Sequence, residues 1–277
     1  MRRAAIALLV TVVLAGCGSS SPPAITIGAA RTFQLASWSP AVVRAGVPTE
    51  LSFRIDQPSG AALTRYRTGS GPHTGVHLII VRSDLGAIIH HHPKPQADGT
   101  FRQQVTFPTP GRYKAVVDAY PQLSGPLRNF QLTRWITVPG KAPKSPLPPF
   151  RPAVTVDGYR FALQGKPSLH AVQANFLTLH VTRPNGTPAT FTPWFGALAH
   201  AIFFRKSDLS YFHTHVCSAQ TSGCTSILGG TRVTGTQTKP GVLRVGVLLP
   251  VGGTWRLFLQ TKIDGRVRTA PFTLDVK

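Results

Sequence analysis

The segment HLIIVRSDL at residues 77–85, followed by HHH at residues 90–92, recurs later in the chain. The second copy reads HAIFFRKSDL at residues 200–209, followed by HTH at residues 213–215. In both copies an apolar run leads into Ser-Asp-Leu, which is a turn signal, and then into closely spaced histidines. This self-similarity predicts that the chain contains two copies of one structural unit.

The repeat extends beyond these segments. Each copy is followed by a glycine-containing turn and an aromatic segment, PGRYKAVV at residues 110–117 and GGTWRLFL at residues 252–259. Tyr113 and Trp255 occupy matched positions in these segments and are predicted to anchor the two cores. Residues 139–149 are rich in proline, which predicts a semi-rigid spacer between the copies.

The hydrophobic pattern of the copies has a period of two residues, which is typical of strands. Leu51, Phe53 and Ile55 alternate with polar residues, and in the matched segment Phe176, Leu179 and Val181 do so approximately. The 26 glycines and 25 prolines disfavour long helices. We therefore predict an all-β fold of two tandem β-sandwich domains, either immunoglobulin-like or cupredoxin-like, joined by the proline-rich linker.

The N-terminus contains a basic start, Met1-Arg2-Arg3, and a short apolar run over residues 4–14, which together indicate an export signal. The following LAGC at residues 14–17 resembles a bacterial lipobox, and this resemblance implies cleavage before Cys17 and lipidation of its thiol. An ordinary signal peptide with a chance cysteine is the alternative. We expect an extracytoplasmic protein held on the cell membrane by a lipid anchor.

These features define the predicted organisation of the chain. It comprises a lipoprotein signal peptide at 1–16, lipidated Cys17 and a flexible tether at 17–30, a first β-sandwich at 31–138, the linker at 139–152, and a second β-sandwich at 153–277. The remaining cysteines, Cys217 and Cys224, are predicted to form a disulfide because an exported compartment is oxidising. A thiolate metal site is the alternative.

The charge of the chain is strongly basic, with 30 Lys+Arg against 9 Asp+Glu and a formal net charge of +21. Glu50 is the single glutamate, which disfavours hydrolases with paired carboxylates and carboxylate cages for calcium. The basic residues are scattered without a dense run, and export removes the chain from nucleic acid, so no nucleic-acid partner is expected. Anionic lipid or cell-wall polymer is the more natural partner, although the charge could simply keep the protein soluble.

Six of the ten histidines repeat at one spacing, because a histidine precedes the next two by 13 and 15 positions in each copy. The six are His77, His90, His92, His200, His213 and His215. A tight hairpin at each Ser-Asp-Leu would place His77 opposite His92 and His200 opposite His215, so that each triad shares one face of its hairpin. A one-residue slip of register would move every side chain to the other face.

Imidazole is a good ligand for zinc and Cu(II), whereas Cu(I) prefers thiolate and thioether, and Met1 is the single methionine. We therefore predict one histidine triad in each domain that binds Cu(II) or Zn(II). The alternative is that the histidines are polar cross-strand pairs or interface residues. His73, His91, His170 and His180 have no matched partners and are expected to be ordinary surface or packing residues.

The repeated aspartates, Asp84 and Asp208, are predicted to stabilise the two turns, because aspartate readily accepts hydrogen bonds from nearby backbone amides. Orientation of a metal-bound histidine is the alternative role.

The segments quoted above resemble a repeated unit of actinobacterial-type secreted proteins and lipoproteins. The resemblance is carried by Trp194 to His200, Asp208 to His215 and Thr254 to Gln260, and by residues 77–85 and 90–93 of the first half. Members of that family are commonly labelled heavy-metal- or copper-associated envelope proteins, so the resemblance implies a metal-related envelope function. This chain departs from the family where Val216 replaces an expected proline and where the Cys217–Cys224 loop is inserted.

Taken together, these features predict a non-enzymatic, membrane-anchored lipoprotein that binds copper or zinc for sequestration, sensing or delivery. The alternative function is an envelope adhesion or scaffolding module that binds protein or anionic cell-wall polymer.

Overall fold

The computed structural model describes residues 32–277 except 124–128, 143–145, 219–226, 229–230 and 233–234. The signal peptide, Cys17 with its lipid anchor and the tether to residue 30 lie outside the described residues and stay predictions. Within the described part of the chain, no helix is long and apolar enough to cross a membrane.

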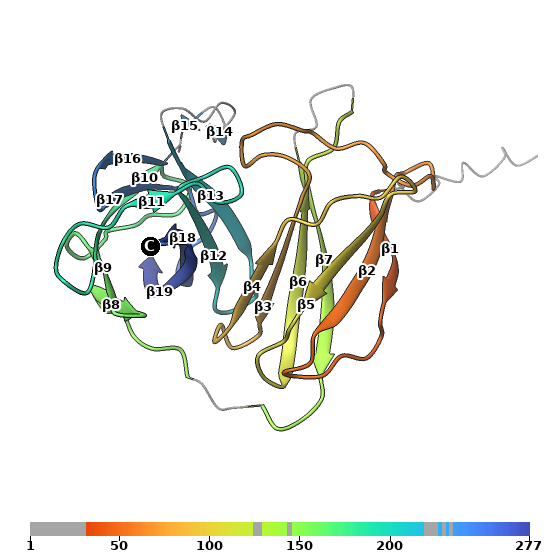
Figure 1. Ribbon diagram of the computed structural model, residues 1–277, viewed down its shortest axis with the longest axis horizontal. Helices are drawn as coiled ribbons and strands as arrows, with labels where there is room; N and C mark the ends of the chain where they lie inside the picture. Colours follow the sequence, from red (N-terminus) through yellow and green to blue (C-terminus); the bar gives the residue numbers. More distant parts are fainter. Residues whose placement is uncertain (1–31, 124–128, 143–145, 219–226, 229–230, 233–234) are drawn as a thin grey trace, which may run out of the picture. The chain divides into compact units, whose positions relative to one another are not determined.

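In the first half, the residues that the structure describes form seven strands in two antiparallel sheets (Figure 1). They are β1 (Gln34–Ser39), β2 (Thr49–Asp56), β3 (Val76–Arg82), β4 (Ile88–His91), β5 (Thr100–Val105), β6 (Gly111–Ala119) and β7 (Phe130–Val138). One sheet has the order β1-β2-β5 and the other β4-β3-β6-β7. Leu51, Phe53 and Ile55 alternate into the core between them, each fully buried, as their period of two predicts.

The described residues of the second half form twelve strands, most of which join one continuous path. They are β8 (Ala153–Val156), β9 (Tyr159–Leu163), β10 (Asn175–Thr182), β11 (Phe191–Thr192), β12 (Ala199–Arg205), β13 (Tyr211–Cys217), β14 (Ile227–Leu228), β15 (Thr231–Arg232), β16 (Gly235–Lys239), β17 (Val242–Val247), β18 (Gly253–Ile263) and β19 (Arg266–Val276). One layer has the order β11-β18-β12-β13, and β19 pairs with its strand β18. The other layer has the order β16-β17-β10-β9-β8. A parallel pairing of β13 with β16 joins the two layers.

The core of the second half departs from prediction at one position. Leu177, Leu179 and Val181 of β10 face the core, whereas Phe176 is 36% exposed and lies beneath the guanidinium of Arg244, 3.4 Å from the ring centroid. The sequence segment NFL holds two adjacent apolar residues, and the strand's alternation can bury only one of them.

The two matched aromatic residues are both fully buried core anchors, as predicted. The Tyr113 hydroxyl donates a 2.8 Å hydrogen bond to the carbonyl of Thr109, and the Trp255 indole donates a 3.1 Å hydrogen bond to the carbonyl of Val251. Each anchor therefore fixes the backbone four residues upstream in the same way. The predicted all-β fold of two tandem β-sandwiches is confirmed.

A third hydrophobic cluster joins the two halves, which belong to one compact unit, Thr32–Lys277. The buried members of this cluster, named here the joining cluster, are Ile79, Val81, Leu85, Val116, Ile202, Phe204, Leu209 and Phe258. Ile79 and Val81 lie on the same face of β3 as His77, and Ile202 and Phe204 lie on the same face of β12 as His200. In each strand the apolar residues follow the histidine by two and four positions, and side chains two apart share a face.

Candidate metal centre

The registers of the two hairpins agree with the prediction from the sequence. Ile79 pairs with His90 between β3 and β4, and His200 pairs with His215 between β12 and β13. Ile202 pairs with His213 in the second hairpin. Each predicted triad therefore shares one face of its hairpin, at the end away from the turn.

The sequence predicts one triad in each domain, and in the structure the two triads meet. The ring centroids of His77 and His213 are 5.1 Å apart, and those of His90 and His200 are 5.0 Å apart. The physical reason is the joining cluster: burying the apolar part of both strand faces also brings their histidine ends together. We call the six residues His77, His90, His92, His200, His213 and His215 the histidine cluster.

Three sets of three imidazoles within the cluster can each bring their ligand atoms within 4.8 Å of one another. The sets are His77, His90 and His213; His90, His92 and His200; and His200, His213 and His215. Two of the three combine residues from both halves, and His90, His200 and His213 each belong to two sets. The triad His77, His90 and His92 of the first half does not form a set by itself, whereas that of the second half does.

Three of the imidazoles, those of His77, His200 and His90, are fixed through the ring nitrogen that faces away from the cluster. His77 Nε2 donates to the Pro72 carbonyl at 2.7 Å, and His200 Nε2 donates to the Trp194 carbonyl at 2.9 Å. A carbonyl only accepts hydrogen bonds, so these contacts assign the proton to Nε2 and leave a lone pair on Nδ1. This is the arrangement that metal-ligating histidines adopt.

His90 is held from the opposite half of the molecule. Its Nδ1 lies 2.9 Å from Oε1 of Gln260 in β18. The Gln260 amide nitrogen donates to Thr269 Oγ1 at 3.1 Å, which orients Oε1 toward the imidazole. His90 Nδ1 is therefore the donor, and the lone pair of its Nε2 faces His92 Nε2 at 3.1 Å.

His213 lies between two of these lone pairs. Its Nδ1 is 3.3 Å from His77 Nδ1, and its Nε2 is 3.2 Å from His200 Nδ1. A neutral imidazole has one N–H, so only one of the two contacts can be a hydrogen bond, and the other sets lone pair against lone pair. A cation removes this conflict. Tetrahedral ligands with ~2.0–2.1 Å Zn–N bonds are about 3.3–3.4 Å apart, close to these separations.

The imidazole of His215 completes the cluster. It is fully buried, and among the described residues neither of its ring nitrogens has a partner. Leaving a buried polar group unsatisfied costs about 1–3 kcal/mol. The side chain is therefore placed at an energetic cost that coordination of an ion would offset.

The surroundings keep the cluster uncharged. Burial lowers the pKa of His77 to about 3 and that of His200 to about 4. Burial first, and then the neighbouring imidazoles, hold the pKa values of His90, His213 and His215 well below the usual range. The imidazoles are therefore neutral at pH 7, which is the form that binds metal.

Aromatic side chains surround the imidazoles. His92 stacks between His77 and Phe195, with ring centroids 4.0 Å and 3.9 Å away. The ring of Trp194 lies edge-on to His90 at 5.3 Å and to His200 at 5.1 Å. In the sequence the Trp194 segment carries only the family resemblance, and no local signal predicts that it encloses the histidines.

The turn that carries these aromatics contacts the first half directly. Trp194 and Ala197 exchange backbone hydrogen bonds of 2.8 and 3.2 Å, and Gly196 between them has a φ of +76°. A Cβ on Gly196 would lie 2.5 Å from the carbonyl oxygen of Ser70. Only glycine therefore fits where this turn meets the loop that supplies the Pro72 carbonyl to His77.

His73, which was expected to be an ordinary residue, lies beside the cluster. Its ring centroid is 4.9 Å from that of His215, and its Nδ1 is 3.2 Å from the Tyr120 hydroxyl. Burial lowers its pKa to about 4. His73 has no counterpart in the second copy, so the repeat gave no signal for it. His91, His170 and His180 belong to none of the three sets.

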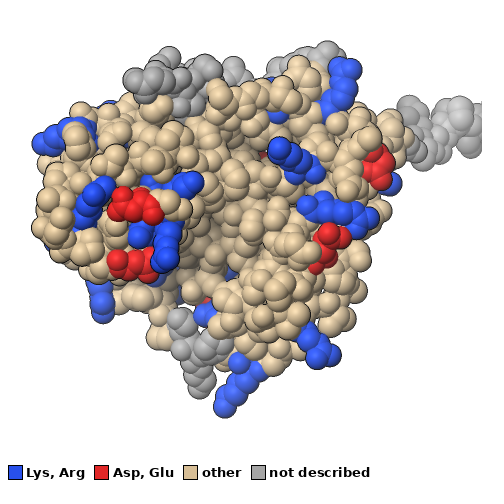
Figure 2. Space-filling model, viewed as in Figure 1, with Lys and Arg blue, Asp and Glu red and all other residues tan. Residues whose placement is uncertain are grey.

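Other predicted residues have simpler roles. Asp84 accepts a hydrogen bond from the Gly86 amide at 2.9 Å, and Asp208 accepts one from the Ser210 amide at 3.0 Å, so both have the predicted turn role. Cys217 is buried at the end of β13, whereas Cys224 lies outside the described residues, and their disulfide stays a prediction. Basic side chains lie scattered over the face shown in Figure 2, several of them next to acids.

Comparisons with solved structures give likenesses at low identity. A bacterial integrin-binding invasin is 15% identical with a TM-score of 0.23, covering 88% of this chain and 38% of that one. A tetra-tandem repeat from the extending region of a large adhesion protein is 10% identical with a TM-score of 0.27, covering 89% and 49%. An E. coli alpha-2-macroglobulin is 11% identical with a TM-score of 0.29, covering 89% and 14%. These likenesses carry no inference about function.

None of the curated proteins matches this chain. A family model described as a domain of unknown function, DUF8832, matches residues 32–134 and 154–277. The two matched regions are the two halves that repeat each other in sequence. The chain therefore belongs to the DUF8832 family.

Proposed function

We propose that the histidine cluster binds a divalent transition metal, Cu(II) or Zn(II), with ligands from both halves of the molecule. The observation that carries the proposal is the position of His213, whose two ring nitrogens each face a lone pair at 3.2–3.3 Å. A metal ion is the natural occupant of a site where neutral, oriented imidazoles present lone pairs to one another.

The ligand chemistry narrows the choice of metal. The site offers imidazole nitrogens, which suit zinc and Cu(II), and the three candidate sets contain no carboxylate. The family resemblance of the sequence motifs, whose members are labelled metal-associated envelope proteins, supports the same reading. We propose the role to be binding for sequestration, sensing or delivery, on a lipoprotein at the outer face of the membrane.

The open side of the cluster suggests where an ion would enter. His92 is only partly buried and lines a cavity of about 680 Å³ together with Tyr66 and Lys94. His77, His200 and His215 are fully buried behind it. An ion would therefore meet His92 first and then the interior imidazoles.

Isothermal titration of Cu(II) and Zn(II) into the chain from Ser19 onward tests the proposal. Wild type is expected to bind, and a His77→Ala/His200→Ala double variant is expected to lose that binding. The matched control is His170→Ala/His180→Ala, which removes two histidines outside the three sets and should bind as wild type does. Equal binding by both double variants would show that the cluster is not the site.

A second readout follows from the shared ligands. An ion that binds the folded state and contacts both halves should raise the melting temperature of the chain, by a roughly constant step for each tenfold increase in its concentration above Kd. The same ion should leave the melting temperature of the His77→Ala/His200→Ala variant unchanged.

A further inference from the structure

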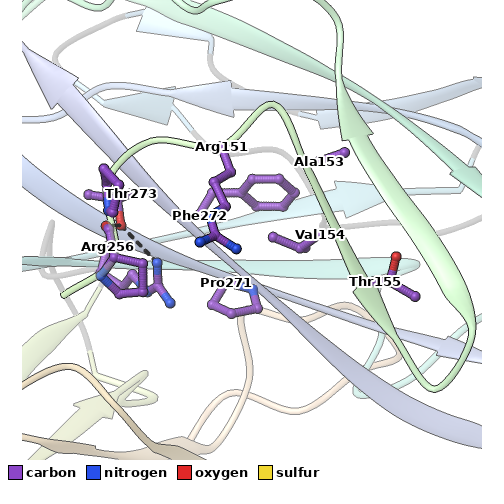
Figure 3. Close-up of a pocket in the computed structure, with 10 residues that line it drawn as sticks. Arg151, Ala153, Val154, Thr155, Arg256, Pro271, Phe272 and Thr273 are labelled. Atoms are coloured by element: carbon purple, nitrogen blue, oxygen red, sulfur yellow. Dashed lines mark hydrogen bonds between the residues drawn. The ribbon is translucent and has the colours of Figure 1, made fainter. Parts of the chain in front are cut away.

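A cavity separate from the histidine cluster lies beside the linker. It has a volume of about 480 Å³ and lies among linker residues Pro148 and Pro149, strand β8 and strands β18 and β19. Figure 3 shows the guanidinium groups of Arg151 and Arg256 both directed toward Pro271 at this cavity. The cavity therefore combines proline, valine and phenylalanine side chains with two positive charges.

Arg256 is the buried charge of this cavity, with 8% of its surface exposed. Its Nη1 donates to Thr273 Oγ1 at 2.8 Å, and that hydroxyl donates onward to the Pro148 carbonyl at 2.6 Å. Its Nε is buried and has no hydrogen-bond partner among the described residues. These contacts fix the guanidinium in place and leave part of its donor set unused.

No acid of this chain neutralises Arg256. All nine Asp and Glu residues lie in the described part of the chain, and none forms an ion pair with it. Three other arginines also have a buried Nε without a hydrogen bond, but each has a carboxylate partner: Arg183 with Asp264, Arg205 with Asp208, and Arg268 with Asp157. Arg256 is thus distinguished by a missing counter-ion.

A buried charge without a partner is strongly disfavoured, and an arginine does not lose its proton to escape this cost. Burial lowers the pKa of Arg256 from its ordinary value, in the direction that a missing counter-ion produces. The geometry of a guanidinium fork matches the two oxygens of a carboxylate or phosphate. The cavity is large enough to admit such a group.

We infer that this cavity binds an oxyanion, the phosphate or carboxylate group of a small molecule or of a lipid headgroup. Arg256 contacts the anion from the interior, and Arg151 contacts it from the exposed rim. The inference does not depend on metal binding, since Arg256 belongs to none of the metal sets. It gives the expected anionic partner a defined place on a chain whose basic residues are otherwise scattered.

The test is titration of inorganic phosphate and acetate into the full chain in detergent, with a chelator present and ionic strength held constant. Wild type is expected to bind these anions saturably. Arg256→Gln should lower the affinity about 10-fold or more, and Arg256→Lys should lower it less, because lysine keeps the charge but loses the planar fork of donors. Arg160→Gln, at an exposed position of β9, is the matched control and should bind as wild type does. Arg151→Gln, at the exposed rim, should weaken binding even if Arg256→Gln fails to fold.

Vesicles of phosphatidylglycerol, compared with phosphatidylcholine, distinguish the two sources of the anion. Vesicle binding that Arg256→Gln abolishes and free phosphate displaces would assign the site to a headgroup, and phosphate or acetate binding alone would assign it to a small solute. The inference is overturned if wild type binds neither anion nor vesicle saturably. It is also overturned if Arg256→Gln and Arg151→Gln bind as Arg160→Gln does.

Discussion

Asp118 and Gln260 occupy matching positions in the two halves, and their different contacts show how the repeat has diverged. Asp118 pairs with His77 between β6 and β3, and Gln260 pairs with His200 between β18 and β12. Gln260 accepts a hydrogen bond from His90 across the two halves. Asp118 instead accepts one from the Tyr211 hydroxyl of the other half at 3.2 Å.

Two matched histidines, His90 and His213, also differ in their contacts. His90 and His213 are counterparts in the two hairpins, but His90 is held by Gln260, whereas His213 contacts His77 and His200. Two copies of one pattern have thus produced one oriented ligand and one shared ligand. The repeat supplies the imidazoles in pairs, and the difference between an acid and an amide at one matched position accompanies their unequal surroundings.

The largest expected effect is on the pH dependence of the metal-free chain. His77 and His200 have folded-state pKa values of about 3 and about 4, below the ordinary 6.5. As the pH falls, these two side chains are therefore protonated in the unfolded chain before they are protonated in the folded one, which favours unfolding. Their contribution to stability is complete above pH 6.5 and should decrease by about 2 kcal/mol each by pH 5. Urea unfolding at pH 7, 6 and 5 with a chelator measures this, and a flat profile would contradict it.

The acid at position 118 should act with the opposite sign. Burial raises the pKa of Asp118 to about 6, so the folded state binds its proton more readily and gains stability as the pH falls below that value. Asp118→Asn makes the two matched positions alike and removes this compensation. The free energy of unfolding of the Asp118→Asn variant should therefore fall more steeply between pH 7 and 5 than that of wild type, as the same urea titrations would measure.

The next effect separates one shared centre from two independent ones. His90→Ala and His213→Ala each remove a ligand that belongs to two of the three sets, and each should lower affinity for Cu(II) or Zn(II) by about 100-fold or more, beyond the ~10–100-fold typical of outer-shell changes. Titration calorimetry gives both affinity and stoichiometry. If the halves bound metal independently, each variant would keep part of the wild-type sites at unchanged affinity.

A smaller effect is expected from the residue that orients His90. Gln260→Leu leaves the Nδ1 proton of His90 without its acceptor and should reduce metal affinity by about 10–100-fold. Gln237→Leu, at an exposed position of β16 in the same half, is the control and should leave affinity unchanged. Indistinguishable affinities for the two variants would show that Gln260 does not position a ligand.

The smallest effect concerns the turn that packs one half against the other. Gly196→Ala and Gly186→Ala both place a side chain at positive φ. A Cβ at position 196 would lie within 2.8 Å of backbone atoms of Ser70, Gly71 and Pro72, whereas a Cβ at position 186 would have no atom within 4 Å. Gly196→Ala should therefore be less stable than Gly186→Ala by about 1–2 kcal/mol. Urea midpoints compare them, and equal midpoints would mean that this contact can relax freely.

Much of the fold could be predicted from local sequence signals. The alternation of Leu51, Phe53 and Ile55 fixed which side of a strand is buried, and the Ser-Asp-Leu turns fixed the registers that place His200 opposite His215. Local signals failed where two apolar neighbours competed, as at Phe176 and Leu177. They also missed His73 and Arg256, whose surroundings come from segments distant in the chain.

By itself, then, the sequence determined the repeat, the strands, the hairpin registers and the triad that each hairpin carries, because all of these depend on residues close together in the chain. Only the tertiary structure decided that the triads form one cluster. Both faces of β3 are apolar, with Leu78 and Ile80 on one side and Ile79 and Val81 on the other. The pattern of β3 cannot say which face packs within its own sandwich and which meets the other half, since that choice depends on the surfaces that the rest of the chain leaves to be buried.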